Sequence, residues 1–116
     1  MSESDLYAQI LTAHSHGAVR LFRVNAGMAW QGLILQQSPS RLVLAHPRMI
    51  RLGVEGLSDL LGWSEGGVFT AIEGKSGTGR LRPAQRAFID LVRRSGGRAG
   101  VARSVEEAGA IIRGEI

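Results

Sequence analysis

Apolar residues recur every three or four positions in three segments of the chain, and this spacing predicts three helices. The first follows capping residues and acids at positions 2–5 and runs to about His14. The second begins at Pro83, because proline fits the first turn of a helix, and stops at a glycine pair. The third follows a capping sequence at 104–107 and ends near Gly114.

Four shorter segments are rich in strand-forming residues instead of showing helical spacing. They are residues 19–24, 58–63, 68–73 and 98–103. The sequence Asn25-Ala26-Gly27 marks a break after the first of them. The Ser-Glu-Gly-Gly sequence at 64–67 is a hairpin turn signal, so we expect the second and third strands to pair antiparallel.

The stretch from Trp30 to Gly56 has a weaker pattern, and a hairpin and a loop-rich insertion are both open there. The order of the remaining segments favours a mixed β-sheet flanked by helices. A chain of 116 residues is close to the most common domain size, and two halves would each be too small to bury a core. We therefore expect one α/β (α+β) domain over residues 1–116.

Composition removes several classes of protein. Hydrophobic residues make up 44% and charged residues 21% of the chain, which is typical of a globular fold. Without cysteine the chain has no disulfide, thiol nucleophile or iron–sulfur site. It has no apolar stretch of membrane-spanning length, and its N-terminus lacks the features of a signal peptide. We expect no membrane partner and a cytoplasmic location.

Arginine dominates the basic residues, because Lys75 is the single lysine among the 14 lysines and arginines. The planar guanidinium binds phosphate through two parallel hydrogen bonds, so this composition and the net charge of +4 fit a polyanionic partner. A GC-rich genome explains the arginines equally well. Composition does not identify the partner, but it makes the single lysine, Lys75, a residue to examine for a function.

Two acids and this lysine are predicted to converge. Asp59 lies near the start of one strand of the expected hairpin, Glu73 lies at the end of the other, and Lys75 follows on the same face because side chains alternate along a strand. Two carboxylates can bind a hard divalent cation such as Mg²⁺. The alternative is an ordinary solvated Glu–Lys ion pair. The apolar strands around both acids favour function, since an unpaired carboxylate is costly there.

Two stretches of sequence resemble a known family. They read GLSDLLGW at 56–63 and FTAIEGKSGTGRLRPAQRAFIDLVRRSGGRAGVARSVEEA at 69–108. In order and spacing they resemble the VRR-NUC domain, a branch of the PD-(D/E)xK nuclease superfamily found in phages and in DNA repair enzymes. The segment LFRVNAGMAWQG and the helix before it resemble the family more loosely. The resemblance covers nearly the whole chain and implies a restriction-endonuclease-like core.

The family pattern has an acid on the first helix, an Asp before a strand, Glu-x-Lys on the next strand, a Gly-Arg-Leu turn and a Gln on the following helix. The matching positions here are Glu3, Asp59, Glu73 with Lys75, Gly79-Arg80-Leu81, and Gln85. The resemblance implies an endodeoxyribonuclease that hydrolyses phosphodiester bonds with Mg²⁺ or Mn²⁺.

The resemblance also implies a role for each matched residue. The carboxylates of Asp59 and Glu73 and the carbonyl of Gly74 would bind the metal. Lys75 would position or polarise the attacking water, and Gln85 would orient Lys75 or the nucleophile.

The acid on the first helix has two candidates. Glu3 lies three and seven residues before Leu6 and Ile10, on the predicted buried stripe, which would direct it at the site as a further ligand or base. Asp5 is the competing candidate. An ordinary acid at a helix N-terminus is a third interpretation.

Two positions depart from the family pattern. Gly74 stands where a bulky apolar residue is usual, and Arg82 stands where a Ser or Thr often caps the helix. Reduced activity is one reading of Gly74, so the alternative function is a catalytically weak or inactive DNA-binding module that keeps the nuclease fold. A further alternative is a catalytic subunit that is inert without partner chains.

DNA is the expected partner. Arg80, Arg82 and Arg86 lie in or just after the turn before the second predicted helix, where they would contact phosphates beside the scissile bond. The resemblance to phage proteins and repair enzymes implies branched or four-way DNA, a homodimer with two active sites, and a phage or prophage origin within a bacterial host. The segment from Trp30 to Leu52 is the predicted dimer interface.

Overall fold

The computed structural model describes residues 1–24 and 27–116, so the expected break at Asn25 and Ala26 lies outside the described residues. The helices predicted from apolar spacing are present as α1 (Glu3–His14), α2 (Pro83–Arg94) and α3 (Val105–Ile112). Their ends match the predicted capping signals. At the start of α3, for example, the Ser104 hydroxyl accepts a hydrogen bond from the backbone N–H of Glu107.

The four predicted strands are also present within the described residues. They are β1 (Arg20–Arg23), β4 (Leu60–Ser64), β5 (Val68–Gly74) and β6 (Arg98–Ala102). They form a sheet in the order β1-β4-β5-β6, in which only the β5–β6 pair is parallel. A parallel pair needs a crossover connection, and α2 provides it. The prediction of a mixed sheet flanked by helices is confirmed.

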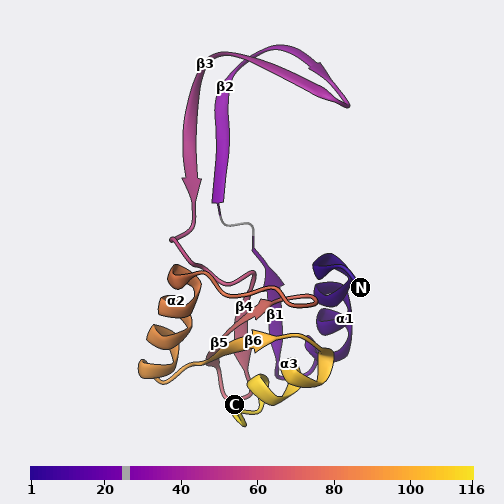
Figure 1. Cartoon of the computed structure of the whole chain (residues 1–116), viewed down its shortest axis with the longest axis vertical. Helices are drawn as coiled ribbons and strands as arrows, with labels where there is room; N and C mark the ends of the chain where they lie inside the picture. Colours follow the sequence, from indigo (N-terminus) through magenta and orange to yellow (C-terminus); the bar gives the residue numbers. More distant parts are fainter. Residues whose placement is uncertain (25–26) are drawn as a thin grey trace.

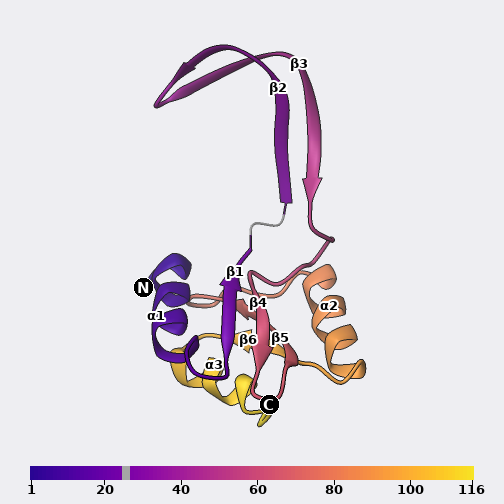
Figure 2. The ribbon, with the colours of Figure 1, turned by 180° about the vertical axis from the view of Figure 1, so that it is seen from behind.

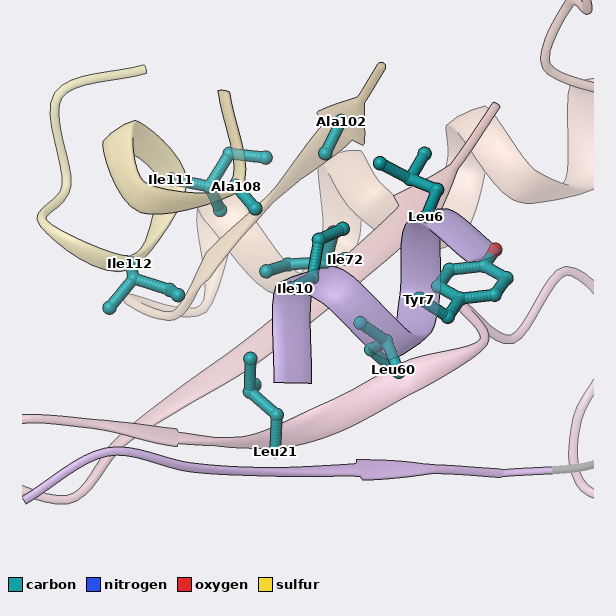
Figure 3. Close-up of a cluster of buried hydrophobic side chains, with 10 residues drawn as sticks. All are labelled: Leu6, Tyr7, Ile10, Leu21, Leu60, Ile72, Ala102, Ala108, Ile111 and Ile112. Carbon is teal, nitrogen blue, oxygen red and sulfur yellow. The ribbon is translucent and has the colours of Figure 1, made fainter. Parts of the chain in front are cut away.

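Helices cover both faces of this sheet (Figure 1 and Figure 2). Helices α1 and α3 lie on one face and α2 lies on the other. The larger core cluster, shown in Figure 3, joins α1 and α3 to the sheet through Leu6, Tyr7, Ile10, Leu21, Leu60, Ile72, Ala102, Ala108, Ile111 and Ile112. A smaller cluster under α2 contains Ala71, Ile89, Val92 and Ala99. Strands β5 and β6 contribute buried residues to both clusters.

The weakly patterned segment is a long hairpin of β2 (Gly27–Ser38) and β3 (Arg41–Leu52), which we call the arm. The hairpin expectation is therefore correct and the loop-rich one is wrong. Figure 1 shows the arm extending away from the sheet and helices. Its strands shift register at two places, and no described side chain of the arm is buried. No face is selected for burial, which explains why the apolar positions show no strict alternation.

The arm also makes the molecule elongated. The chain extends over 50 × 30 × 28 Å with a radius of gyration of 16.5 Å, whereas a compact chain of this length has a radius of about 13 Å. Among the described residues, neither strand of the arm packs substantially against another helix or strand. An isolated two-stranded hairpin is only marginally stable in water. The arm therefore has no hydrophobic core of its own among the described residues, and its side chains do not pack substantially against the rest of the domain.

Candidate active site

Two carboxylates meet where the β4–β5 hairpin leaves the core. The antiparallel register pairs Leu60 with Ile72, so Asp59 and Glu73 are the next residues along the two strands. The backbone N–H of Asp59 donates to Oε2 of Glu73 over 3.3 Å. The structure thus brings together the two acids that the hairpin signal placed side by side.

Glu73 is a buried carboxylate with an unusual affinity for its proton. Its exposed fraction is only 2%. Burial raises the pKa of Glu73 to about 7, and the negative charge of Asp59 adds to this effect, while the positive charge of Lys75 opposes it. Two adjacent carboxylates in a poorly solvated position attract a cation, which relieves both burial and repulsion.

Lys75 lies beside Glu73 on the same side of the strand. Its backbone N–H donates to the carbonyl of Ala102 over 3.1 Å, which extends the β5–β6 pairing past Gly74. The ammonium lies 3.7 Å from Oε1 of Glu73, and the lysine side chain is 13% exposed. It is therefore directed into the site and is not a freely solvated surface cation.

Gln85 connects α2 to this pair of strands. Its amide Nε2 donates to Oε1 of Glu73 over 3.0 Å, and its carbonyl Oε1 accepts from the backbone N–H of Arg82 over 2.9 Å. From the sequence we expected Gln85 to orient Lys75 or the nucleophile, but its amide holds Glu73. The second hydrogen bond supplies the N-terminal cap that the side chain of Arg82 does not provide.

The structure distinguishes the two acids of α1. Glu3 lines the same cavity as Asp59 and Glu73, whereas the carboxylate of Asp5 accepts a hydrogen bond from the backbone N–H of Ser2 in a capping box. The expectation that Glu3 lies on the buried stripe is wrong, because it is exposed at the first turn of the helix. Glu3 therefore lines the cavity from the exposed first turn of α1.

A cavity of about 730 Å³ opens in front of these residues. Its charged lining comprises Glu3, Arg51, Glu55, Asp59, Glu73, Lys75 and Arg82, together with buried Gln85. Arg51 at the base of the arm and Glu55 after it were not identified from the sequence. No local motif marks them, because they join the site only through the way the arm is connected to β4.

The three arginines predicted to contact phosphates do not all line the same cavity. Arg82 lines the cavity, whereas Arg80 and Arg86 line a separate hollow together with Arg103. Arg103 donates to the carbonyls of Gly77 and Gly79 over 3.1 and 2.6 Å and so braces the loop that carries Arg80. The structure therefore places Arg82, but not Arg80 or Arg86, at the cavity that contains the two acids.

Tyr7 of α1 is a site residue that the sequence did not reveal. Its hydroxyl donates to Oδ2 of Asp59 over 2.8 Å and accepts from the backbone N–H of Gly74 over 2.9 Å. Burial raises the pKa of Tyr7 well above its ordinary value, and the negative charge of Glu73 adds to the shift, so the phenol keeps its proton. Its position in the apolar stripe of α1 resembles that of any core aromatic.

The donors present fit a hard divalent cation. Within the described residues, no three His, Asp or Glu side chains form a complete metal cage. The carboxylates of Asp59 and Glu73 nevertheless provide oxygen donors at the cavity, and the carbonyl of Gly74 follows Glu73 directly along β5. Mg²⁺ and Mn²⁺ accept such oxygen ligands, and Mg²⁺ commonly keeps several waters and a phosphate oxygen in its shell.

A mixed sheet between helices, with an Asp, a Glu-x-Lys motif and a Gln at one cavity, defines a nuclease-type hydrolase. The VRR-NUC domain model matches residues 3–106, and the chain belongs to that family. The family acts on DNA and generally uses divalent metal ions. No curated protein matches the chain. None of the described helices has the length and apolar character needed to cross a membrane.

Proposed function

We propose that this protein is a Mg²⁺- or Mn²⁺-dependent DNA endonuclease. The observation that carries the proposal is the convergence of Asp59, Glu73, Lys75 and Gln85, which come from different elements, at one open cavity. Structural ion pairs are usually placed at solvated surfaces, whereas this group is buried on one side and open to a cavity on the other. The cavity leaves room for a phosphate and a water.

Asp59, Glu73 and the Gly74 carbonyl would hold the metal ion. A bound divalent ion would supply the positive charge that polarises a phosphate and makes a water molecule more acidic. Gln85 keeps the Glu73 carboxylate in place through its 3.0 Å hydrogen bond. Lys75 orients the attacking water and stabilises the negative charge that develops on the phosphate oxygens. Hydrolysis forms a new P–O bond to the water oxygen and breaks one ester P–O bond.

The direct test is incubation of the purified protein with Mg²⁺ or Mn²⁺ and a panel of linear, flapped and four-way DNA. Cleavage that stops on addition of a chelator supports the proposal. DNA binding without cleavage of any substrate would favour the inactive binding module. Cleavage only after addition of a host extract would favour a subunit that needs partner chains. A bacterial cytoplasm as the compartment, and a phage or prophage origin with a role in DNA repair, remain predictions.

Arg82 is the predicted phosphate contact that lies at the cavity. The variant Arg82→Ala is expected to bind all DNA sequences more weakly to the same extent. The slope of the logarithm of the DNA-binding constant against the logarithm of the salt concentration should decrease by about 1 in magnitude, because one phosphate contact is lost. Fluorescence anisotropy over a series of salt concentrations, in Ca²⁺ to prevent cleavage, measures both quantities.

Arg94→Ala provides the matched control, because Arg94 lies at the far end of α2 and does not line the cavity. It should leave the salt slope unchanged. Equal slopes for Arg82→Ala and the wild-type protein would contradict a phosphate contact at Arg82. Arg80→Ala and Arg86→Ala test whether DNA also follows the separate hollow beside Arg103.

We further propose that the arm joins two copies of the chain in a homodimer. Its exposed apolar side chains are Met28, Trp30, Leu33, Ile34, Leu35, Leu42 and Met49. Each of these side chains is between 44% and 68% exposed. Trp30 and Met49 lie opposite each other across the two strands and form one continuous apolar face with Met28.

A twofold dimer suits a branched substrate. Resolution of a four-way junction needs two symmetric nicks, and two copies would present two active sites at a fixed separation. The arm contains Arg41, Arg48 and Arg51 but no Asp or Glu, so it does not repel DNA held between the copies. Branched or four-way DNA is therefore the substrate we propose.

The dimer predicts a mass of two chains in light scattering at micromolar concentration. Replacement of two exposed apolar residues in the variant Trp30→Glu with Leu33→Glu is expected to give a monomer, because it puts charges into the interface. Leu91→Glu is the matched control, since Leu91 is also about half exposed, at 54%, but lies on α2. A monomeric wild-type protein, with and without junction DNA, would exclude the dimer.

A further inference from the structure

Tyr7 reaches from α1 to both strands that carry the proposed metal ligands. Its side chain is buried, with 1% exposed, and lies at one side of the core cluster in Figure 3. Its hydroxyl contacts Oδ2 of Asp59 at 2.8 Å and the backbone nitrogen of Gly74 at 2.9 Å. The carbonyl oxygen of Gly74 lies 3.2 Å from the same hydroxyl. One atom of α1 therefore contacts both a carboxylate ligand and a backbone ligand.

The hydroxyl has one proton to share between two acceptors. The shorter contact assigns that proton to Oδ2 of Asp59, and a bond to a charged acceptor is the stronger one. The backbone N–H of Gly74 then donates to the phenol oxygen. This arrangement fixes the side-chain direction of Asp59, leaves its Oδ1 for a ligand, and leaves the Gly74 carbonyl without the phenol proton.

Gly74 provides the space that the tyrosine ring occupies. A Cβ atom at position 74 would lie 2.6 Å from Cε1 and 2.9 Å from Cζ of Tyr7, and Cβ atoms in proteins do not come this close to a non-bonded carbon atom. The ring has little freedom to move away, because it is buried and the guanidinium of Arg23 lies 4.9 Å from its centroid. Only glycine at position 74 is compatible with a tyrosine at position 7.

We propose that Tyr7 is the positioning residue of the metal site and that Gly74 stands in the Glu-x-Lys motif because Tyr7 fills the space of its side chain. Glycine at this position then accompanies a working site and is not a sign of lost activity. The proposal rests on the metal-dependent function proposed above. It assigns to α1 a role beyond packing, because this helix controls the geometry of ligands on β4 and β5.

The test is Tyr7→Phe, which keeps the ring and removes only the hydroxyl. Mn²⁺ affinity is measured by isothermal titration calorimetry on the full chain without DNA, and cleavage is measured over a range of Mn²⁺ concentrations. We expect Mn²⁺ binding to weaken about 10-fold, as is typical when a residue that orients a ligand is changed. Saturating Mn²⁺ should restore most of the cleavage rate, since every ligand is still present.

Thr70→Val is the matched control. It removes another buried hydroxyl on β5, one that lies 2.5 Å from the hydroxyl of Ser64, away from the site. It should lower thermal stability without changing Mn²⁺ affinity. If Asp59→Ala loses Mn²⁺ binding but Tyr7→Phe keeps the wild-type affinity, the proposed role of Tyr7 is overturned and the proposed metal site still stands. A wild-type protein that neither binds Mn²⁺ nor cleaves DNA would overturn the proposed function and this role with it.

Discussion

Asp59→Asn and Glu73→Gln are each expected to lower the rate of DNA cleavage at saturating Mg²⁺ by at least about 10³-fold, equivalent to about 4 kcal/mol of transition-state stabilisation. Both changes remove a negative charge and nearly preserve volume. Asp59→Asn keeps an oxygen that can accept from Tyr7, and Glu73→Gln keeps one that can accept from Gln85. The loss therefore reports metal binding and not a collapsed site.

Single-turnover cleavage with excess protein measures this effect, because it separates the chemical step from product release. Circular dichroism and thermal melting in a chelator should show that both variants remain folded. Glu65→Gln is the control carboxylate, since Glu65 lies in the exposed turn at the other end of the β4–β5 hairpin. Cleavage by Glu73→Gln at the wild-type rate would contradict the mechanism.

Much of the fold could be predicted because its signals are local. Helix α2 has its apolar residues at helical spacing and Pro83 at its start, and the turn at 64–67 joins β4 to β5 as its glycines predict. The same hairpin register places Asp59 beside Glu73. These carboxylates could therefore be placed together before the positions of the helices were known.

The remaining features depend on long-range contacts that leave no local pattern. The hydroxyl of Tyr7 contacts the carbonyl of Gly74 across 67 positions of sequence, and Tyr7 looks like any other apolar position of α1. Arg80 and Arg86 lie close to Arg82 in sequence but point into a different hollow. In the arm no described side chain is buried, so the positions of its apolar residues do not indicate which face of each strand points to a core.

Because Gly74 contacts the ring of Tyr7, the effect of Gly74→Ala on the free energy of unfolding should depend on which residue occupies position 7. In the wild-type protein, Gly74→Ala is expected to lower the free energy of unfolding by about 2–3 kcal/mol, because the new methyl group overpacks a buried ring. In a Tyr7→Leu background the ring is absent, and the same change should be neutral or stabilise by about 0.5–1 kcal/mol, since alanine restricts the unfolded chain more than glycine does.

Urea unfolding of the four proteins, Tyr7→Leu, Gly74→Ala, the double variant and the wild type, forms a double-mutant cycle that measures this coupling directly. The cycle also separates packing from ligand geometry, because the double variant should be at least as stable as Tyr7→Leu and yet should not regain Mn²⁺ affinity in titration calorimetry. The leucine fills part of the space of the ring but has no hydroxyl to hold Asp59. An equal cost of Gly74→Ala in both backgrounds would mean that glycine is required at position 74 by something other than the tyrosine ring.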